Sequence, residues 1–246
     1  MNLLDKVALV TGGAKRLGRE IALALAREGC DIVVHYRTAR EEADELAAEI
    51  RGMGRQAWCV CGDFSNAYEP AVTMKTAWDL AGWIDILVNN ASVYSHDSFQ
   101  DVSIERMEEL WRVNSLAPMM LARKMHELAF SCKILPENYC GRVINILDRS
   151  IVKPTEENLP YWLSKKDLEA FTAAAALSTA PRFTVNAVAP GPVLAPSDKR
   201  LSEAAGLLPL AVRPSPADVA AAVVYLAGAV TVTGQTIFVD SGQHLL

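Results

Sequence analysis

The sequence lacks any long uninterrupted apolar run. Although 51% of its 246 residues are hydrophobic, no stretch approaches the roughly 18 consecutive apolar residues that suggest a membrane-spanning helix. The N-terminus also lacks a basic segment followed by an apolar one, so we expect no signal peptide. These two absences predict a cytoplasmic protein without a membrane partner.

The chain also has a small net charge and few cysteines. The net charge of −5 provides no general attraction for nucleic acid, so any phosphate must be bound by a few placed basic residues. Five cysteines are present, and the spacing of Cys59 and Cys61 matches neither a zinc site nor a redox pair. We therefore expect buried, reduced thiols and no metal site.

Short apolar runs alternate with longer segments of helical period. The runs cover 7–10, 32–34, 57–60, 84–88, 143–147, 184–188 and 237–239. One helix carries Leu17, Ile21, Ala22 and Leu25 on a single face and precedes Gly29, and the others span roughly 40–51, 68–81, 103–130, 160–179 and 216–229. The alternation predicts a parallel sheet, and apolar residues at consecutive positions predict strands covered on both faces. We expect one Rossmann-like, doubly wound α/β domain over residues 1–246, with about seven strands and helices on both faces.

The segment 192–216 contains five prolines. It is too long for a routine connection, and long loops in compact domains are often lids or binding loops. We expect the residues 192–215 to form a substrate loop.

Glycines follow the first apolar run in the segment Thr11–Gly18, which opens a helix. Glycines at such a turn let the pyrophosphate of a dinucleotide approach the backbone, and the helix N-terminus supplies free N–H groups. Tight turns also need glycine, so this loop alone is a weak signal.

The second run ends in His35-Tyr36-Arg37-Thr38. A site for NAD usually has a carboxylate here to accept the ribose 2′-hydroxyl. That carboxylate is missing, whereas Arg37 offers charge-assisted hydrogen bonds to a 2′-phosphate and Lys15 adds positive charge nearby. A merely solvated Arg37 is the alternative, but the joint pattern favours NADP(H).

Tyr161 and Lys165 have the i, i+4 spacing of residues that share a helix face. A nearby ammonium favours the phenolate and lowers the pKa of a tyrosine, which suits proton transfer. The pattern is common by chance, so it needs support from other residues.

Together these elements resemble the short-chain dehydrogenase/reductase family along essentially the whole chain. The matching elements are Thr11–Gly18, Asp63, Asn89–Ser92, Asn114, Tyr161 with Lys165, and Pro190 with Gly191. The resemblance implies that Asp63 meets adenine, that Lys165 binds the nicotinamide ribose, and that Asn114 positions a water in a proton relay. The cofactor residues that we expect are Gly12, Lys15, Arg16, Leu17, His35, Tyr36, Arg37, Thr38, Asp63, Phe64, Asn90, Ala91, Ser92, Lys165, Pro190, Gly191 and Val193. Members of the family generally assemble as tetramers, here through the helices at 103–130 and 160–179.

Two departures from the common family pattern are informative. Asp148 occupies the position of the usual serine, thirteen residues before the tyrosine, and Arg16 replaces the middle glycine of the loop. An ionised carboxylate cannot donate a hydrogen bond to a carbonyl oxygen, so Asp148 argues against ordinary ketone reduction. Both departures resemble the pteridine reductase branch, which includes the bacterial dihydromonapterin reductases.

In that branch an aromatic ring, here Tyr94, stacks on a flat pterin. The resemblance implies substrate contacts from Arg16, Ser92, Tyr94, Asp148 and Tyr161. Packing of Tyr94 in the core is the alternative for this residue, and drifted activity is the alternative for Asp148.

We therefore expect an NADPH-dependent pteridine reductase with Asp148, Tyr161, Lys165 and Asn114 as catalytic residues. The pro-S hydride of NADPH would reduce a 7,8-dihydropterin (dihydromonapterin, dihydrobiopterin or dihydrofolate), and Tyr161 would donate a proton towards N5. A carbonyl or 3-oxoacyl reductase of the same fold is one alternative. A non-enzymatic NADP(H)-binding sensor is a more remote one.

Overall fold

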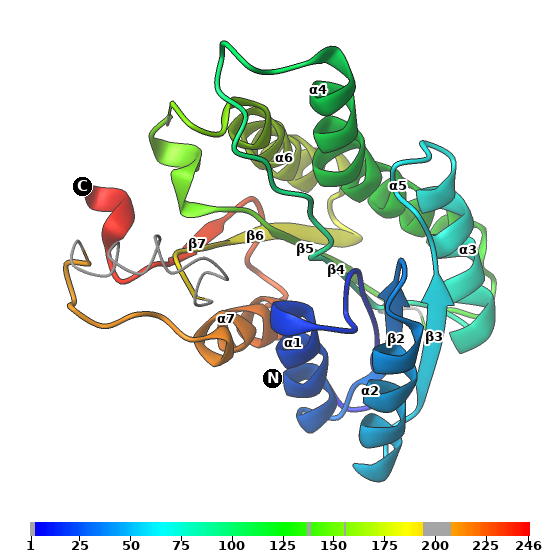
Figure 1. Ribbon diagram of the computed structural model, residues 1–246. Helices are drawn as coiled ribbons and strands as arrows, with labels where there is room; N and C mark the ends of the chain where they lie inside the picture. The colour runs from blue at the N-terminus through cyan, green and yellow to red at the C-terminus, as the bar shows by residue number, and fades with distance from the viewer. Residues whose placement is uncertain (1–2, 137–138, 155, 194–207) are drawn as a thin grey trace.

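The computed structural model describes residues 3–136, 139–154, 156–193 and 208–246. Strands and helices alternate along the chain (Figure 1). The strands are β1 (Val7–Val10), β2 (Asp31–Tyr36), β3 (Ala57–Cys61), β4 (Ile86–Asn89), β5 (Gly141–Ile146), β6 (Phe183–Pro190) and β7 (Thr236–Val239). The α-helices are α1 (Arg16–Arg27), α2 (Arg40–Gly52), α3 (Glu69–Ala81), α4 (Ile104–Trp111), α5 (Ala117–Ser131), α6 (Leu159–Thr179) and α7 (Pro216–Gly228).

All seven strands form one parallel sheet in the order β3-β2-β1-β4-β5-β6-β7. The chain starts at the centre, so β1 pairs with β2 on one side and with β4 on the other. This order reverses direction between β1 and β4, and ligands of such sheets bind beyond the carboxyl ends of the strands at that point. The predicted single-domain, doubly wound α/β fold is confirmed.

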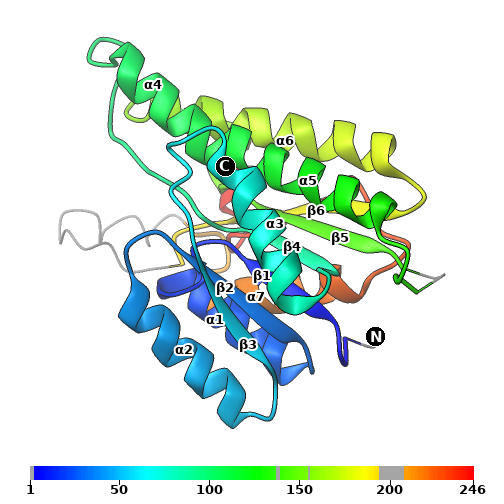
Figure 2. The ribbon, with the colours of Figure 1, turned by 90° about the vertical axis from the view of Figure 1, so that its right-hand side faces the viewer.

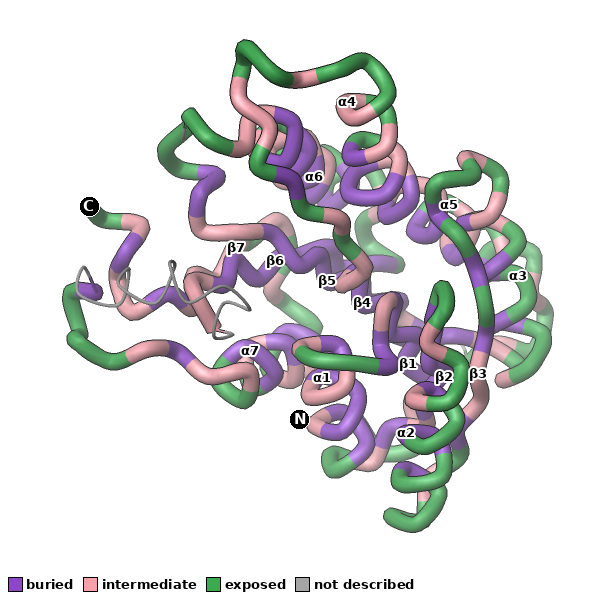
Figure 3. Tube along the Cα trace, in the orientation of Figure 1, coloured by how far each residue is buried: buried purple, intermediate pink, exposed green. Residues whose placement is uncertain are grey.

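Helices cover both faces of the sheet (Figures 1 and 2). One layer contains α1, α2 and α7, and the other contains α3, α5 and α6. The central strands are buried along their whole length (Figure 3). Burial on both faces explains why their apolar residues are consecutive. The helix α1 buries Ile21, Ala22 and Leu25 against the sheet, as its periodicity predicts.

The predicted helix at 103–130 is interrupted in the structure. A π-helical turn, η1 (Arg112–Leu116), separates α4 from α5. Pro118 lies in the first turn of α5, where proline is tolerated. The apolar periodicity continues across the turn, so the sequence pattern did not reveal it.

Two other expectations need correction or lie outside the described residues. All five cysteines are free, but only Cys30 is buried, three are partly buried and Cys61, the last residue of β3, is exposed, so the expectation of buried thiols was wrong for most of them. Most of the expected substrate loop, residues 194–207, lies outside the described residues. Among the described helices, none is long and apolar enough to cross a bilayer.

Candidate active site

The loop between β1 and α1 is shaped by two glycines. Gly12 has a φ of +58°, in the left-handed region that favours glycine. A Cβ atom on Gly18 would collide with the carbonyl oxygen of Gly12 and with the Asn90 side chain. The loop therefore packs closely under the N-terminus of α1, whose free N–H groups provide a site for phosphate.

A set of hydrogen bonds joins this loop to the end of β4. The Thr11 hydroxyl accepts from the backbone N–H groups of Asn90 (2.9 Å) and Ala91 (3.0 Å) and donates to the Val88 carbonyl (3.2 Å). The Asn90 side-chain amide donates to the carbonyl oxygens of Thr11 (2.9 Å) and Gly12 (3.1 Å). These bonds fix the two segments that diverge at the point where the strand order reverses.

Two cavities open at this point. The first has a volume of about 470 Å³ and extends past the ends of β2 and β3, where it is lined by Tyr36, Arg37, Thr38, Asp63 and Phe64. The second has a volume of about 630 Å³ and extends to Asp148, Tyr161 and Gly191. Both are lined by Gly12, Lys15, Arg16, Ala91 and Ser92, so they meet over the glycine loop. Two chambers joined over a phosphate-binding loop fit the two nucleoside halves and the pyrophosphate of a dinucleotide.

Basic and acidic groups share the entrance of the first cavity. The Arg37 guanidinium makes no hydrogen bond or ion pair with the described residues, and its charge helps to lower the pKa of Asp63. The main cause of that lowered pKa is a hydrogen bond from the Ser65 backbone N–H to the Asp63 carboxylate (3.0 Å). Lys15 is paired with Glu42 on α2 (Nζ to Oε1, 2.5 Å). Arg37 is therefore available for an anionic ligand, whereas Lys15 shares its charge with a carboxylate.

Tyr161 and Asp148 are in direct contact in the second cavity. The Tyr161 hydroxyl donates to Asp148 Oδ2 (3.2 Å), and Asp148 Oδ1 accepts from the Ser150 N–H (2.8 Å) at the start of the short helix η2 (Arg149–Val152). Burial and the negative charge of Asp148 raise the pKa of Tyr161 well above 10, while the Ser92 hydroxyl opposes this effect. Tyr161 is therefore protonated at neutral pH, so the site holds a hydroxyl proton, and the raised pKa makes this hydroxyl a weaker acid than that of a free tyrosine.

Lys165 lies behind Tyr161 on α6, and its side chain is only 3% exposed. Its ammonium donates to the Ile146 carbonyl (2.8 Å) and lies 5.7 Å from the centre of the Tyr161 ring. Burial lowers the pKa of Lys165 to about 8, and the Asp148 charge partly opposes this. We expected Lys165 to lower the pKa of Tyr161; the net direction is opposite, because burial and the adjacent carboxylate dominate.

The π turn η1 places Asn114 between the segment that follows β4 and the helix α6. Its side-chain oxygen accepts from the Val93 N–H (2.8 Å) and the Ser92 hydroxyl (3.1 Å). Its amide nitrogen donates to the Val93 carbonyl (2.8 Å) and the Ser164 hydroxyl (3.0 Å). These four bonds use the whole capacity of the amide. A relay water, as expected from the sequence, would therefore have to bind elsewhere than on the side chain.

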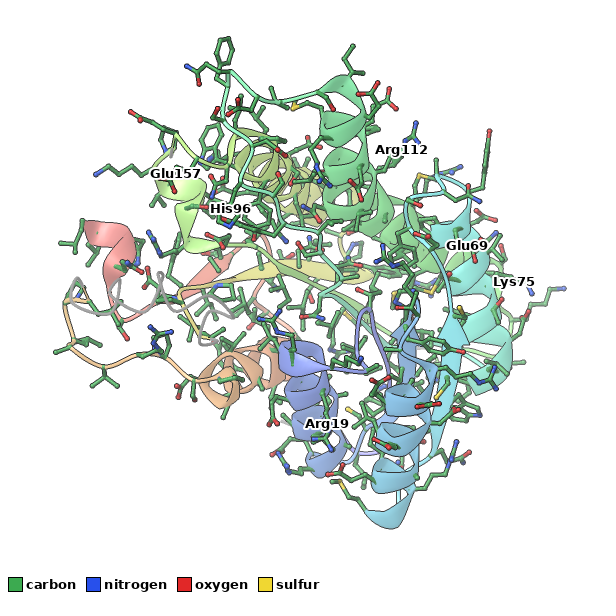
Figure 4. The ribbon with its side chains drawn as sticks, viewed as in Figure 1. Arg19, Glu69, Lys75, His96, Arg112 and Glu157 are labelled. Carbon is green, nitrogen blue, oxygen red and sulfur yellow. The ribbon has the colours of Figure 1, made fainter. Side chains whose placement is uncertain are left out.

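Tyr94 stands at the mouth of the second cavity. Its side chain is 51% exposed, which excludes the alternative of packing in the core. Its ring meets the Tyr161 ring edge to face at 4.7 Å between centroids, and its hydroxyl accepts from the Asn158 amide (3.2 Å). His96, labelled in Figure 4 on the segment between β4 and α4, also packs edge to face with the Tyr94 ring, at 4.9 Å between centroids. The Tyr94 ring is thus oriented yet accessible.

Most residues expected from the sequence line one of the two cavities. The exceptions are Asn114, Lys165 and Pro190, which are buried behind the cavity walls. The sequence did not indicate other residues that border the site or support it, namely Ala39, Gly62, Val93, Val113 and Ser164. Ala14 and Pro192 also border the cavities, and they fall within the predicted glycine loop and the predicted substrate loop. Gly62 directly precedes Asp63, but the small and apolar residues carry no chemical signal of their own.

Comparisons with known proteins agree with this arrangement. The crystal structure of FolM alternative dihydrofolate reductase 1 from Brucella canis, complexed with NADP, superposes with a TM-score of 0.91 at 32% identity, covering 100% of this chain and 97% of that one. The corresponding protein from Brucella suis, also in complex with NADP, gives a TM-score of 0.88 at 34% identity over 98% of this chain and 96% of that one. These complexes are consistent with NADP(H) as the cofactor.

Sequence comparison identifies the wider group. A 3-oxoacyl-[acyl-carrier-protein] reductase from Synechocystis is 32% identical, covering 98% of each chain. The family model described as short chain dehydrogenase matches residues 6–206, a range that includes the glycine loop, Asn114, Tyr161 and Lys165. With this match and the cavities built from those residues, the chain belongs to the short-chain dehydrogenase family of oxidoreductases.

Proposed function

We propose that this oxidoreductase is an NADPH-dependent pteridine reductase that converts a 7,8-dihydropterin into its tetrahydro form. The observation that carries the proposal is the hydrogen bond from Tyr161 to Asp148, where the family usually has a serine. A serine hydroxyl donates to a carbonyl oxygen, whereas a carboxylate accepts and repels a developing oxyanion. The proposed substrate therefore has a ring nitrogen, rather than a carbonyl oxygen, to be protonated.

The first cavity would hold the adenosine half of the cofactor. Asp63 and Phe64 border it at the end of β3, and Arg37 is available for the 2′-phosphate. The glycine loop and the N-terminus of α1 would bind the pyrophosphate. Lys165 would donate to the nicotinamide ribose from behind Tyr161. NADPH, when bound, supplies the hydride for C6 of the dihydropterin.

Proton transfer would be carried out by Tyr161 and Asp148. Tyr161 is kept protonated by its buried, anionic surroundings, so its hydroxyl can give its proton to N5 as C6 is reduced. The new N–H and C–H bonds replace the N5=C6 double bond. A proton that reaches Asp148 from solvent, through the open cavity, would then restore the Tyr161 hydroxyl over the 3.2 Å contact. Lys165 and Ser92 would stabilise the transient phenolate.

Substrate binding would use the accessible ring of Tyr94. An aromatic ring at the cavity mouth favours a flat heterocycle over an extended acyl chain. Arg16 and Ser92, which also line the second cavity, would supply polar contacts to the heterocycle or to the pyrophosphate. The likeness to the two FolM alternative dihydrofolate reductases supports a substrate of this class.

The direct test compares dihydromonapterin, dihydrobiopterin, dihydrofolate and a 3-oxoacyl ester in parallel, following NADPH oxidation by its absorbance. We expect turnover of the pterins and little or none of the ester. Turnover of the ester alone would refute the proposal and favour the second candidate, a 3-oxoacyl or carbonyl reductase. That candidate is kept because of the likeness to the Synechocystis enzyme.

Replacing Asp148 separates the two activities within one protein. Asp148→Ser should lower pterin kcat by at least about 100-fold, in keeping with the loss of a general acid–base group, while raising reduction of simple ketones. Asp148→Asn is the matched control: it keeps the shape and can accept the Ser150 N–H bond, but it cannot carry the proton. Unchanged pterin turnover in both variants would remove the role assigned to Asp148.

We also propose a cytoplasmic homotetramer. Apolar side chains are exposed along α4 and α6, among them Ile104, Trp111, Leu163 and Leu177. A groove of about 420 Å³ between these helices includes Trp111 and Leu163. Light scattering should give the mass of four chains, and a monomer at micromolar concentration would contradict the proposal.

A further inference from the structure

His35 has its imidazole buried near the end of β2, with 2% of the residue exposed. Its Nδ1 accepts from the Gly12 N–H (3.0 Å), and its Nε2 lies 3.1 Å from the Gly62 carbonyl oxygen. The ring stacks on Phe64 with 4.3 Å between centroids and an angle of 1°. One side chain thus contacts both segments that border the first cavity.

The partners determine which nitrogen carries the proton. A backbone N–H only donates, so Nδ1 must be an unprotonated acceptor. A carbonyl oxygen only accepts, so Nε2 must carry the hydrogen and donate it to Gly62. The ring is therefore neutral, in the Nε2–H tautomer. Burial also lowers the pKa of His35 to about 4, so this form persists at neutral pH.

These contacts connect parts of the site that are distant in sequence. Gly12 belongs to the phosphate-binding loop after β1, while Gly62 and Phe64 flank Asp63 after β3. The His35 main-chain oxygen also accepts from the Gly13 N–H (2.9 Å). Because the imidazole lies between the two loops, its length sets their separation and the orientation of the Gly12 peptide.

We propose that His35 is a positioning residue for NADP(H): its neutral ring holds the phosphate-binding loop in register with the Asp63 loop, so that cofactor affinity depends on an acceptor at the Nδ1 position. This inference rests on the proposed binding of NADP(H). His35 contributes no free polar atom to the cavity, since both ring nitrogens are used within the protein. Its effect on the cofactor therefore passes through Gly12 and Gly62.

Acidification should weaken the arrangement, because a protonated Nδ1 turns an acceptor into a second donor facing the Gly12 N–H. The charged groups that line the same cavity as His35 are Arg37, directly after β2, Asp63 after β3, and Lys15 and Arg16 on the glycine loop, while Glu69 lies close to Gly62. Several of these groups would also contact the cofactor, so the effect of acid on binding is compared between the wild type and the variants.

Two substitutions each keep one of the two hydrogen bonds of His35 and remove the other. In His35→Asn the amide oxygen can take the place of Nδ1 and accept from Gly12, whereas the bond to Gly62 is lost. In His35→Gln the longer amide can donate to the Gly62 carbonyl in place of Nε2, whereas Gly12 loses its acceptor. Both variants lose the stacking on Phe64, so they form a matched pair.

Affinity for NADP+ is measured by titration calorimetry near neutral pH and at about pH 3.5, below the pKa of about 4 that burial gives His35, because the oxidised cofactor is stable in acid. We expect His35→Asn to bind within a few-fold of wild type and His35→Gln to bind about tenfold more weakly, as for a lost hydrogen bond to a buried N–H. Acid should weaken the wild type several-fold more than His35→Asn. Equal losses in both variants, or equal acid sensitivity, would overturn the inference.

A second measurement needs no variant. The ¹⁵N chemical shifts of the His35 ring in the wild-type protein report its tautomer, and we expect a protonated Nε2 and an unprotonated Nδ1. The opposite tautomer would overturn the inference even if both variants failed to fold. A wild-type protein that does not bind NADP+ would instead refute the proposed function, so the two failures are distinguishable.

Discussion

Lys165→Met should make the protein more stable at neutral pH while abolishing its activity. The folded structure lowers the pKa of Lys165 from its ordinary value of 10.5 to about 8. Each pKa unit corresponds to about 1.4 kcal/mol, so holding the ammonium in this buried place costs about 3 kcal/mol. Methionine fills a similar volume without a charge. Methionine loses the hydrogen bond to the Ile146 carbonyl, and this loss cancels about 1 kcal/mol of the gain. We therefore expect the free energy of unfolding to rise by about 2 kcal/mol.

The sign of the pH dependence follows from proton binding. Below pH 8 the lysine is charged in both states, so the wild type carries the full penalty. Between about pH 8 and 10.5 the unfolded chain retains the proton that the folded chain has released. The wild type therefore gains stability as pH rises through this window. Lys165→Met has no such group, and its advantage should disappear as the pH approaches 10.5.

Urea unfolding of the wild type and the variant at a series of pH values measures this difference, because all other groups titrate in both. Lys166→Met is the matched control: the neighbouring lysine has a side chain that is 40% exposed and pairs with Glu169 at the surface. It should change the free energy of unfolding by less than about 1 kcal/mol at every pH. Parallel stability profiles for wild type and Lys165→Met would refute the argument.

Three further changes test other parts of the site. Arg37→Asp should weaken NADPH binding about 10- to 100-fold, as for the loss of a charge-assisted hydrogen bond, and NADH binding far less; equal losses measured by fluorescence titration would refute the 2′-phosphate assignment. Arg16 has a φ of +52°, so Arg16→Gly should leave the free energy of unfolding unchanged or raise it by up to about 1 kcal/mol. The same change should raise the KM for pterin. A clear loss of thermal stability would contradict the backbone argument. Thr11→Val removes the hydroxyl that accepts from Asn90 and Ala91 and should lower the free energy of unfolding in urea by about 3 kcal/mol. Thr11→Ser keeps the hydroxyl and should lower it by less than about 1 kcal/mol. Equal losses in both variants would contradict the role of the hydroxyl.

The architecture could be predicted from the sequence because its signals are local. Strands buried on both faces need consecutive apolar residues, as in β1 and β4, and α1 shows its buried face in the spacing of Ile21 and Leu25. The NADP(H) preference was also local, since Arg37 lies next to the end of a strand in the sequence itself. Such features depend on neighbours along the chain.

What the sequence did not reveal depends on contacts between distant segments. The net rise in the pKa of Tyr161 requires its distance to Asp148 and its burial. The tautomer of His35 is determined by Gly12 and Gly62, which lie 23 and 27 residues away. No local residue pattern signalled the π turn at Asn114, where four hydrogen bonds to other segments compensate for the irregular backbone.

That turn has a consequence for how the two helices are coupled to each other. A π turn behaves as an α-helix with one inserted residue, and one residue corresponds to about 100° of rotation around a helix axis. The insertion lets α4 and α5 face their surroundings independently, although they are continuous in sequence. A change in the packing of α4 against α6, where the Trp111 indole donates to Asp167 (3.0 Å), therefore need not turn α5 in the core. Asn114 remains anchored at the joint between the two helices by its four side-chain hydrogen bonds.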